Sequence, residues 1–389
     1  MKKCIIIGVS DSRSQWFPPE INSVISAGKV FSGGRRHHEI MQSVVPVDAI
    51  WIDITVPLRD VFRSYEAYDD IIVFASGDPL FYGFANTVMR ECPDVALTVY
   101  PSFNSLQMLA HRLKMPYHDM LAVSLTGRPW NGLDNALIGN AGFIGCLTDK
   151  HKTPHDIHHR MMEYGYDNYE MYVGENLGNE EKERYGMYDE TMEYDDPNCV
   201  ILRQKTERHH FMGIPDDAFH LLNGRAKMIT KMPVRLATLA TMELYRRNRM
   251  WDIGFCTGSI SIEARLQYPH LHITAFEIRE EGRLLMEQNS RKFHAPGINA
   301  IISDFTNCDV SCLESPDAVF IGGYGGKMEC VMRKVHENLK AGGVIVFNSV
   351  SEDSRNEFRR IAGVLGMTVS EPYTIKINDN NPITILKAE

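Results

Sequence analysis

A glycine-containing loop in the second half of the chain has the residue types of a nucleoside-binding site. The segment WDIGFCTGS (251–259) follows an apolar strand pattern and precedes a helical pattern. Glycines stand at 254 and 258, but Cys256 and Ser259 occupy positions where the dinucleotide fingerprint GxGxxG needs further glycines. What remains is a tight strand-to-helix turn, which lets a ligand approach the backbone closely at the carboxyl ends of the strands.

Two carboxylates follow at the ends of the next predicted strands. Glu277 lies at the end of HITAFEI, and a carboxylate about 20 residues after such a loop commonly accepts hydrogen bonds from ribose hydroxyls. Asp304 ends the segment NAIISD and belongs to the same rim. Together these features predict an adenosine site without a phosphate requirement, as S-adenosylmethionine would need. The alternative is that the glycines only form a turn and that Glu277 is a surface acid.

A second glycine loop and a basic stretch point to a large anionic ligand. The loop GGYGG (322–326) follows the apolar segment AVFI, and its bare backbone would allow contact with a planar molecule, although a simple tight turn is the alternative. Between Arg225 and Arg249 the chain has seven Lys or Arg residues against one acid, Glu243. These cations either form an ordinary helix surface or face an anionic substrate.

The first half has its strongest signal in DIIVFASGDPLFYG (70–83), where an apolar strand leads into Gly77, Asp78 and Pro79. A local explanation is a helix start, with Asp78 as the N-cap and Pro79 in the first turn. Similar strand-to-turn segments follow in VYPSFNSLQMLAHRL (99–113), LAVSLTGRPW (121–130) and FIGCLTDKHKTP (143–154).

The elements that must position these loops alternate between strand and helix patterns. Apolar runs such as CIIIGV, AIWIDI, ALTVYPS, YEMYVGE and CVILRQ alternate with amphipathic stretches such as PEINSVISAG, which predicts α/β layers with mainly parallel sheets. The second half predicts an open doubly wound sheet. We place one domain at 1–205, a linker at 206–212 and a second domain at 213–389, because a polar segment with Gly213 and Pro215 follows CVILRQ.

Composition narrows the function classes. The chain has 389 residues, enough for two or three domains, and a formal net charge of −9, which disfavours a general nucleic-acid binder. No apolar run approaches the ~18–20 residues of a membrane span. The eight cysteines are scattered without a CxxC pair, so we expect a reduced cytoplasmic protein without a metal site. His155, His158 and His159 have helical spacing that suits a metal or, far more often, an exposed helix face.

These motifs resemble two known families. ASGDPLFYG, PSFNSLQMLAHRL, SLTGR, CLTDKHKTP and ENLGNEEK are similar to the tetrapyrrole (precorrin) methylases, which implies a two-lobed first domain. ITKMPVR, WDIGFCTGSISIEA, FIGGYGG and LKAGG are similar to the precorrin-6B C15-methyltransferases, which have a Rossmann-like S-adenosylmethionine-dependent fold. Joined in this order, the halves resemble the decarboxylating precorrin-6Y C5,15-methyltransferases of cobalamin biosynthesis.

The resemblance implies one S-adenosylmethionine per domain and a set of donor-binding residues. In the first domain these are Gly8, Gly77, Asp78, Pro79, Ser102, Ser105 and Thr148. In the second they are Thr230, Gly254, Phe255, Cys256, Thr257, Gly258, Glu277, Asp304 and Phe305. We expect substrate contacts from Arg128, Lys231, Arg235, Gly322, Gly323 and Gly325, with Arg35, Arg36 and Arg112 as further candidate cations.

The implied reaction methylates precorrin-6B, or its cobalt form, at C5 and C15 and decarboxylates the C12 acetate to give precorrin-8. The second domain is expected to perform C15 methylation and decarboxylation, and the first domain C5 methylation. A precorrin is an electron-rich macrocycle, so no side-chain nucleophile is needed. We expect a homo-oligomer with a small-molecule substrate and no nucleic-acid or membrane partner. The alternatives are a methyltransferase of RNA or of another small molecule, and a donor-binding module without catalysis.

Three positions depart from the family patterns. The first loop, usually GxGPG, is GVSDS here, with Ser10, Asp11 and Ser12. Thr126 stands where a histidine is usual in SLTGR, and Cys256 replaces the usual middle glycine of the second-domain loop. A side chain at position 256 narrows the freedom of the backbone.

Overall fold

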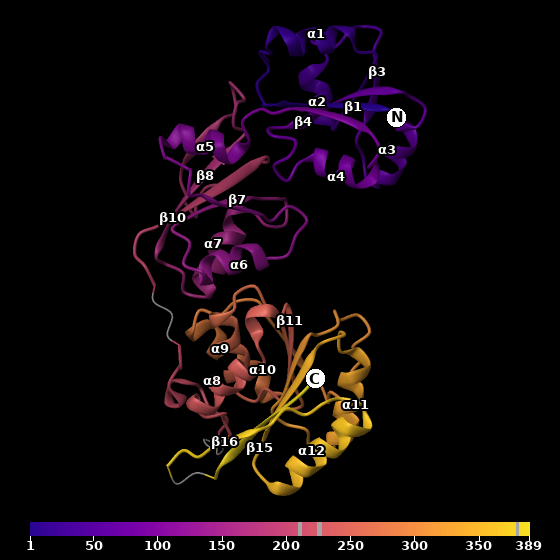
Figure 1. Cartoon of the computed structure of the whole chain (residues 1–389). Helices are drawn as coiled ribbons and strands as arrows, with labels where there is room; N and C mark the ends of the chain where they lie inside the picture. Colours follow the sequence, from indigo (N-terminus) through magenta and orange to yellow (C-terminus); the bar gives the residue numbers. More distant parts are fainter. Residues whose placement is uncertain (209–211, 224–227, 379–380) are drawn as a thin grey trace. The chain divides into compact units, whose positions relative to one another are not determined.

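The computed structural model describes residues 1–208, 212–223, 228–378 and 381–389, which form two compact units (Figure 1). The first unit comprises Met1–Gly132, Ala141–His159 and Asn168–Thr206. The second comprises Leu133–Asn140, Arg160–Asp167 and Glu207–Glu389. Part of the linker expected at 206–212 lies outside the described residues, and the domain boundaries stay a proposal.

The first sheet of the first unit is parallel throughout, in the order β3-β2-β4-β1-β5. Its strands are β1 (Lys3–Val9), β2 (Val30–Gly33), β3 (Ile50–Asp53), β4 (Asp70–Ser76) and β5 (Ala96–Tyr100). Its helices are α1 (Pro19–Ala27), α2 (Arg35–Met41), α3 (Leu58–Tyr65) and α4 (Phe84–Glu91). Apolar side chains of α1 and α2 pack on one face and those of α3 and α4 on the other, which explains the near-continuous apolar sequences of β1 and β4.

The second sheet of this unit has the order β6-β7-β10-β8-β9. Its strands are β6 (Leu121–Ser124), β7 (Phe143–Leu147), β8 (Tyr169–Glu175), β9 (Arg184–Met187) and β10 (Asn198–Gln204), and α5 (Ser105–Leu113) packs against it. The neighbouring helices are α6 (Asn131–Ile138) and α7 (Pro154–Glu163). Only β6 and β7 are parallel, so the expectation of mainly parallel sheets is wrong here. Strands β8 and β9 follow one another without a helix, and neighbouring strands joined by such a short connection are antiparallel.

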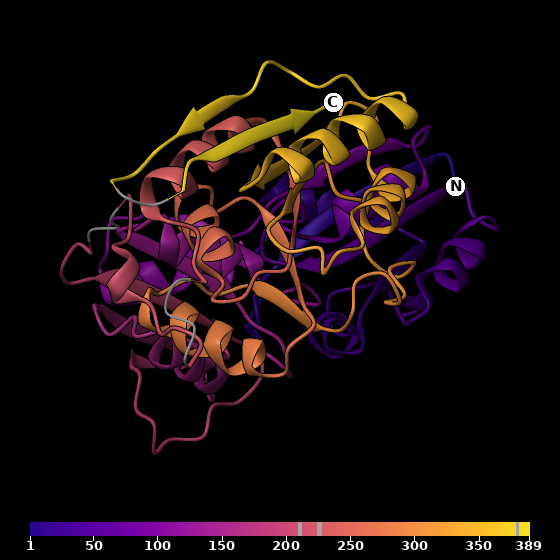
Figure 2. The same ribbon diagram turned by 90° about the horizontal axis from the view of Figure 1, so that it is seen from below.

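The second unit contains one sheet in the order β13-β12-β11-β14-β15-β17-β16. The five parallel strands are β11 (Arg249–Ile253), β12 (His272–Glu277), β13 (Ile298–Ile302), β14 (Ala318–Ile321) and β15 (Val344–Ser349). Strands β16 (Tyr373–Ile375) and β17 (Ile383–Ala388) are antiparallel, as the two yellow arrows of Figure 2 show. The predicted doubly wound sheet is confirmed, because the strand order reverses beside β11.

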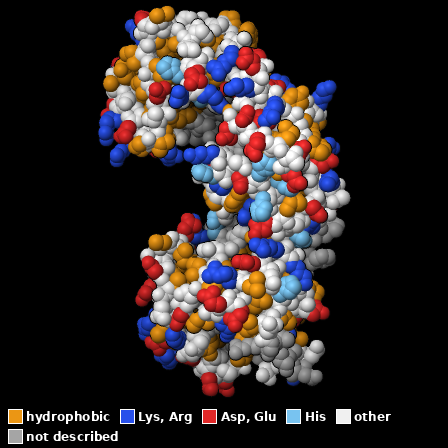
Figure 3. Space-filling view, turned by 180° about the vertical axis from the view of Figure 1, so that it is seen from behind, with side chains coloured by type: hydrophobic (Ala, Val, Ile, Leu, Met, Phe, Trp, Pro, Cys, Tyr) orange, Lys and Arg blue, Asp and Glu red, His pale blue; other side chains and the backbone are white. Residues whose placement is uncertain are grey.

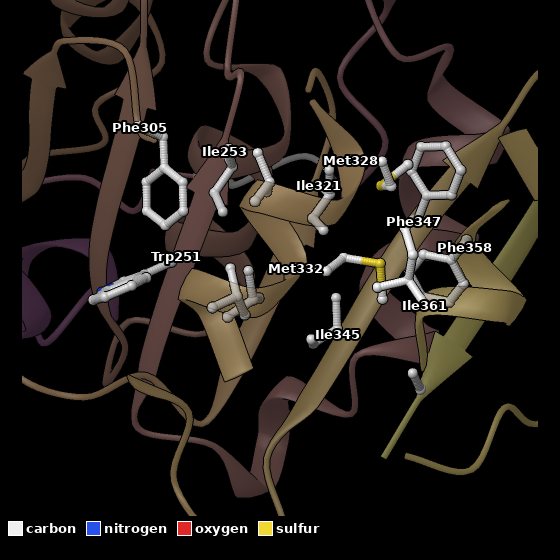
Figure 4. Packing of buried hydrophobic residues seen from close by; sticks show 14 of the residues in the cluster. Trp251, Ile253, Phe305, Ile321, Met328, Met332, Ile345, Phe347, Phe358 and Ile361 are labelled. Atoms are coloured by element: carbon white, nitrogen blue, oxygen red, sulfur yellow. The ribbon is translucent and has the colours of Figure 1, made fainter. Parts of the chain in front are cut away.

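Helices cover both faces of this sheet. They are α8 (Met232–Thr241), α9 (Ser259–Gln267) and α10 (Glu281–Lys292), followed by α11 (Met328–Asn338) and α12 (Glu352–Val364). Trp251, Ile321 and Ile345 pack against α11 and α12 (Figure 4), whereas the alternate strand residues Met250 and Phe320 pack in the cluster that contains α8 and α9. This alternation of successive side chains between the two faces is the period of a strand that is buried on both sides.

None of the helices in the described part of the chain is long and apolar enough to cross a bilayer.

Candidate active sites in the two units

The second unit has a cavity of about 700 Å³ at the carboxyl ends of β11, β12 and β14. Two glycine loops form its floor, and their backbones touch. Gly254 has a φ of +77°, and a Cβ there would lie only 2.6–2.8 Å from main-chain atoms of Gly323. Glycine is therefore required at position 254 both for its backbone conformation and for the close approach of the two loops.

Glu277 anchors the first of these loops. Its Oε2 accepts a hydrogen bond from the backbone N–H of Cys256 at 2.9 Å. Its Oε1 accepts from the N–H groups of Ile278 and Arg279 at 3.0 and 3.1 Å and from the Arg279 guanidinium at 3.0 Å. The carboxylate is buried and fixed in direction, and Oε2 retains capacity for another donor.

Cys256 has a positive φ, which explains why the family usually has a glycine at this position. Its φ is +53°, in the left-handed region that costs a side-chain-bearing residue roughly 1–2 kcal/mol. The thiol donates to the carbonyl oxygen of Met228 at 3.2 Å. The side chain is accommodated, and the loop keeps the geometry that a glycine would adopt.

Two buried polar atoms at the cavity have no hydrogen-bond partner among the described residues. Asp252 accepts from the Ser261 hydroxyl at 2.6 Å through Oδ2, while its Oδ1 is unpaired. The Thr257 hydroxyl is also unpaired. Burial raises the pKa of Asp252 to about 7, and the nearby Glu277 contributes in the same direction. Because unpaired buried polar atoms are costly, these two favour a polar ligand at this position.

Asp304 and Phe305 line the cavity next to Glu277, because they follow β13, which pairs in parallel with β12. Asp304 Oδ2 accepts from Lys327 Nζ at 2.8 Å, and Oδ1 accepts from the N–H of Thr306 at 2.9 Å. These bonds lower the pKa of Asp304 to about 2. Phe305 is buried and packs edge-on against Trp251 and Phe276, so it joins the rim to the core (Figure 4).

Most of the residues predicted for the second site line this cavity. They are Thr230, Lys231, Gly254, Phe255, Cys256, Thr257, Glu277, Asp304, Phe305, Gly322, Gly323 and Gly325. Gly258 does not line it, but its φ of +75° forms the turn into α9.

Arg235 is a correction to the sequence-based set. Its side chain is fully buried, and its guanidinium bonds Glu263 at 3.1 Å, Asp216 at 3.3 Å and the carbonyl of Thr230 at 2.9 Å. Its hydrogen-bonding groups serve the fold, so we withdraw the expected contact with substrate. Arg225 and Lys227 of the same basic stretch lie outside the described residues.

Several lining residues were not predicted from the sequence. Asp252 interrupts an otherwise apolar strand two positions before the glycine turn, and that polar interruption was a usable signal. Val350, Ile375 and Ile377 add apolar surface from the far end of the chain. The positions of Ile375 and Ile377 depend on how β16 pairs in the sheet, which no local pattern reveals.

The first unit has its own cavity, of about 520 Å³, which includes the ends of β1 and β4 and residues of the second sheet. A crossing of backbones supports its floor. The N–H of Gly77 donates to the carbonyl of Val9 at 2.8 Å, and the N–H of Ser102 donates to the carbonyl of Gly77 at 3.2 Å. A Cβ on Gly8 would lie 1.9 Å from the Gly77 oxygen, so no side chain fits there.

The GVSDS loop is held by the ENLGNEEK segment. Glu180 accepts from the Ser12 hydroxyl at 2.5 Å and from the N–H groups of Arg13 and Ser14 at 3.0 and 3.4 Å. These hydrogen bonds lower the pKa of Glu180 to about 2. Glu175, in the same acid-rich segment, is buried and accepts from Arg184 at 2.8 Å, whereas Glu180 is exposed.

The predicted residues of the first site fall into two groups. Gly77, Ser105 and Thr148 line the cavity. Gly8, Asp78, Pro79 and Ser102 do not line it: Gly8 lies in β1, and the other three belong to the turns that follow β4 and β5.

Asp78 and Arg128 are two further residues of the first unit that the sequence analysis singled out. Asp78 Oδ1 accepts from the N–H of Leu80 at 2.9 Å in a turn, and α4 begins only at Phe84, so the local prediction of a helix start at Asp78 is wrong. Arg128 is exposed and stacks its guanidinium over the ring of Tyr82, which does line the cavity, at 4.8 Å.

Of the other candidate groups, Arg36 lines the first cavity, whereas Arg35 and Arg112 do not. Arg35 is exposed and pairs with Glu39 at 3.5 Å, so we withdraw its expected contact with substrate. Arg112 bonds Glu183 through two nitrogens. The ring of His155 bonds the Tyr188 hydroxyl at 2.7 Å and the Met192 carbonyl at 2.9 Å. Within the described ranges, no group of three or more His, Cys, Asp or Glu residues is arranged to hold a metal ion.

Comparison with known proteins gives the chain a family. Residues 30–187 match the family of tetrapyrrole (corrin/porphyrin) methylases, and residues 223–386 match the precorrin methyltransferase domain. A Sinorhizobium precorrin-6Y C(5,15)-methyltransferase [decarboxylating] is 28% identical over 90% of this chain and 84% of its own length. A Salmonella typhimurium cobalt-precorrin-6B C(15)-methyltransferase (decarboxylating) is 32% identical over 34% of this chain and 68% of its own length.

The chain belongs to the precorrin-6Y C5,15-methyltransferase family. A crystal structure of a precorrin-6Y C5,15-methyltransferase from Geobacter metallireducens covers 46% of this chain and 99% of its own, with 32% identity and a TM-score of 0.43. As a member of this family, the chain is a methyltransferase, and S-adenosylmethionine is the methyl donor that the family implies.

Proposed function

We propose that the chain is a bifunctional methyltransferase of cobalamin biosynthesis. It methylates precorrin-6B, or the cobalt form, at C5 and C15 and removes the carboxyl group of the C12 acetate as CO2, which gives precorrin-8. The first unit methylates C5, and the second methylates C15 and decarboxylates. The observation that carries the proposal is the presence of two separate glycine-floored cavities, each at the carboxyl ends of a parallel sheet, in a chain of this family.

The second cavity fits S-adenosylmethionine. Glu277 would accept the ribose hydroxyls, because its carboxylate is already fixed by main-chain donors. The unpaired atoms of Asp252 and Thr257 would meet polar groups of the donor, and Gly254 and Gly323 would let the backbone approach it. The bound donor supplies a methyl group that is activated by its sulfonium charge.

The remaining task of the protein is orientation. Displacement at a methyl group needs an in-line approach of the attacking carbon, and orientation contributes up to about 7–11 kcal/mol in ideal cases. Ile278, Val350, Ile375 and Ile377 give the second cavity an apolar wall against which a flat macrocycle would lie. Lys231, at the rim, is a candidate partner for its carboxylates.

The first cavity would bind a second donor molecule. Gly77, Ser105 and Thr148 would contact it, and Arg128 on Tyr82 would meet the substrate at the rim. Acidic and basic side chains are interspersed on the face drawn in Figure 3. Individual cations must therefore attract the anionic macrocycle, because screening beyond about 8 Å weakens the net negative field at physiological salt.

The test is incubation of the whole chain with S-adenosylmethionine and precorrin-6B, followed by mass spectrometry of the macrocycle. We expect a gain of two methyl groups and a loss of one CO2. An unchanged macrocycle in the presence of a protein that binds the donor would contradict the proposal and favour a non-catalytic donor-binding module. Methyl transfer to RNA with a steep dependence on salt would favour the other alternative.

A further inference from the structure

We propose that Arg36, His37 and Ser76 form a carboxylate-binding subsite at the first cavity. This inference rests on the proposed function, which supplies a ligand with several carboxylates. All three residues line the cavity, and they come from two elements: Ser76 ends strand β4, and Arg36 and His37 lie in the first turn of α2.

Ser76 accepts two hydrogen bonds, which determines what its hydroxyl can do. Arg36 Nη2 donates to Ser76 Oγ at 2.9 Å. His37 Nε2 is also 2.9 Å from this oxygen. The backbone N–H of Gly34 donates to His37 Nδ1 at 3.3 Å, so Nδ1 carries no proton. A neutral ring then has its proton on Nε2, and Nε2 is the donor to Ser76.

The histidine stays neutral in this arrangement. Burial, together with the adjacent Arg36 guanidinium, lowers the pKa of His37 to about 4. With both lone pairs of the Ser76 oxygen occupied, its hydroxyl can only donate. Among the residues that the structure describes, no acceptor for this proton is present. The side chain is exposed at the cavity, so this proton is available to solvent water or to an acceptor group of a ligand that displaces the water.

Arg36 adds a positive charge to this donor. Its Nε lies 3.4 Å from Asp11 Oδ1, on one side of the guanidinium, and its side chain is 39% exposed. Asp11 is itself held by Asn179, whose Nδ2 is 3.4 Å from Oδ2. The ion pair engages Nε and the hydrogen bond to Ser76 engages Nη2, so Nη1 of this cavity-lining side chain has no hydrogen-bond partner among the described residues. Donors without acceptors beside a cation suit a carboxylate.

Two ligands of the proposed reaction contain a carboxylate: the macrocycle, in its acetate and propionate side chains, and the donor, in its amino-acid part. Separate binding measurements distinguish these sources. We would titrate the full chain with precorrin-6B, followed by absorbance, and with S-adenosylmethionine, followed by calorimetry.

The adjacent arginine provides a matched control. The Arg35 side chain is 94% exposed and pairs with Glu39 at 3.5 Å, and Arg35 does not line the cavity. We expect Arg36→Met to weaken binding of one of the two ligands by about 10- to 100-fold, the range for loss of charged hydrogen bonds, whereas Arg35→Met leaves both affinities unchanged. Ser76→Ala should weaken the same ligand by a smaller factor, and both variants should keep the wild-type unfolding temperature.

The outcomes separate the inference from the proposed function. Weaker binding of precorrin-6B assigns the subsite to the macrocycle, and weaker binding of S-adenosylmethionine assigns it to the donor. Equal affinities in the folded Arg36→Met and Arg35→Met variants would overturn the inference. If the wild-type chain binds precorrin-6B but transfers no methyl group, the proposed function fails, while the comparison of the two arginine variants still decides the subsite.

Discussion

The two cavities hold their first glycine loops in different ways. In the second unit the loop 254–258 rests against the backbone of Gly323, and its other support is the buried carboxylate of Glu277, which accepts main-chain N–H groups. In the first unit, Gly8 crosses the backbone of Gly77, but the following GVSDS residues are held by an exposed-loop carboxylate, Glu180, from a distant segment.

This difference shows two ways in which a loop that lacks the family's usual glycines can keep its position at the cavity. Where a side chain replaced glycine in the second unit, at Cys256, the strained backbone conformation was kept. In the first unit, Ser10 and Ser12 stand at glycine positions of the family pattern and Asp11 at its proline position, and hydrogen bonds from Ser12 and Arg13 to Glu180 fix the loop. Both units should therefore be sensitive to a side chain added where two backbones cross, at Gly8 and at Gly254, and the first unit should in addition be sensitive to loss of the Glu180 carboxylate.

The largest effect is expected for Gly8→Ala. The new Cβ would lie 1.9 Å from the Gly77 carbonyl oxygen and 2.7 Å from the Ser102 nitrogen, and both are main-chain atoms that cannot rotate away. We expect about 3 kcal/mol of destabilisation, near the upper end for overpacking, and loss of C5 methylation. Gly142→Ala in the same unit, where a Cβ meets nothing within 4 Å, is the control for thermal unfolding.

Gly254→Ala should be nearly as harmful in the second unit. It combines a left-handed φ of +77° with contacts of 2.6–2.8 Å to Gly323, so we expect about 2–3 kcal/mol of destabilisation and loss of C15 methylation and CO2 release. Gly326→Ala shares the positive φ, +76°, but has open space, and should cost only about 1 kcal/mol. Equal effects of the two substitutions in chemical denaturation would show that the contact between the loops does not matter.

Glu180→Gln tests the hydrogen bonds by which Glu180 holds the GVSDS loop of the first unit. We expect donor affinity at this unit to fall roughly 3- to 10-fold, because the bonds to Ser12, Arg13 and Ser14 lose their charge. The pKa of Glu180 is lowered to about 2. The stabilisation from its charged hydrogen bonds is therefore fully present above the ordinary glutamate pKa and is lost as pH falls toward 2. Glu181→Gln, next in sequence and exposed, is the control, and a matching loss in that variant would exclude a specific role of Glu180.

Asp252→Asn tests the buried acid of the second unit through its pH dependence. The folded-state pKa, about 7, lies above the ordinary value, so the folded chain holds the proton more tightly than the unfolded chain. Stability of the second unit should therefore fall as pH rises from about 4 to 7, by at most about 1.4 kcal/mol per pH unit. The asparagine variant cannot ionise and should lack this component, whereas Asp353→Asn, an exposed acid, should retain it. Parallel wild-type and Asp252→Asn curves of Tm against pH would refute the assignment.

Cys256→Gly is expected to have the smallest effect. Glycine adopts the φ of +53° without strain, which stabilises the fold by roughly 1–2 kcal/mol. Two losses offset most of this gain: glycine loses more backbone conformational entropy on folding than cysteine, and the hydrogen bond from the thiol to Met228 is removed. We expect a Tm at or slightly above that of the wild type and donor affinity at least as high. Weaker donor binding, measured by calorimetry, would show that the thiol itself contributes to the site.

The sequence was most informative where one apolar run ends in a turn. The runs at 4–9 and 70–76 form β1 and β4, because a strand that is buried on both faces has a continuous apolar sequence. The segment 251–258 forms the end of a strand and its turn, because the positive φ values of that turn favour glycine. Glu277 and Asp304 were identified from their place after such strands.

Other features depend on contacts between distant segments. Ser12 and Glu180 are 168 positions apart, so no local pattern could pair them. From the sequence, Arg235 is interpreted as a cation available to substrate, but in the folded chain it forms ion pairs with Glu263 and Asp216, which are distant in sequence. The short strands β9 and β16, with three or four residues each, gave too little periodicity to be predicted.

The central claim is that each unit binds its own methyl donor. Calorimetric titration of the full chain with S-adenosylmethionine tests it most directly, with wild type, Gly8→Ala, Gly254→Ala and the double variant compared at a temperature where all are folded. The account predicts two sites in the wild type, one in each single variant and none in the double variant. A single site in the wild type, or loss of all binding in either single variant, would contradict it.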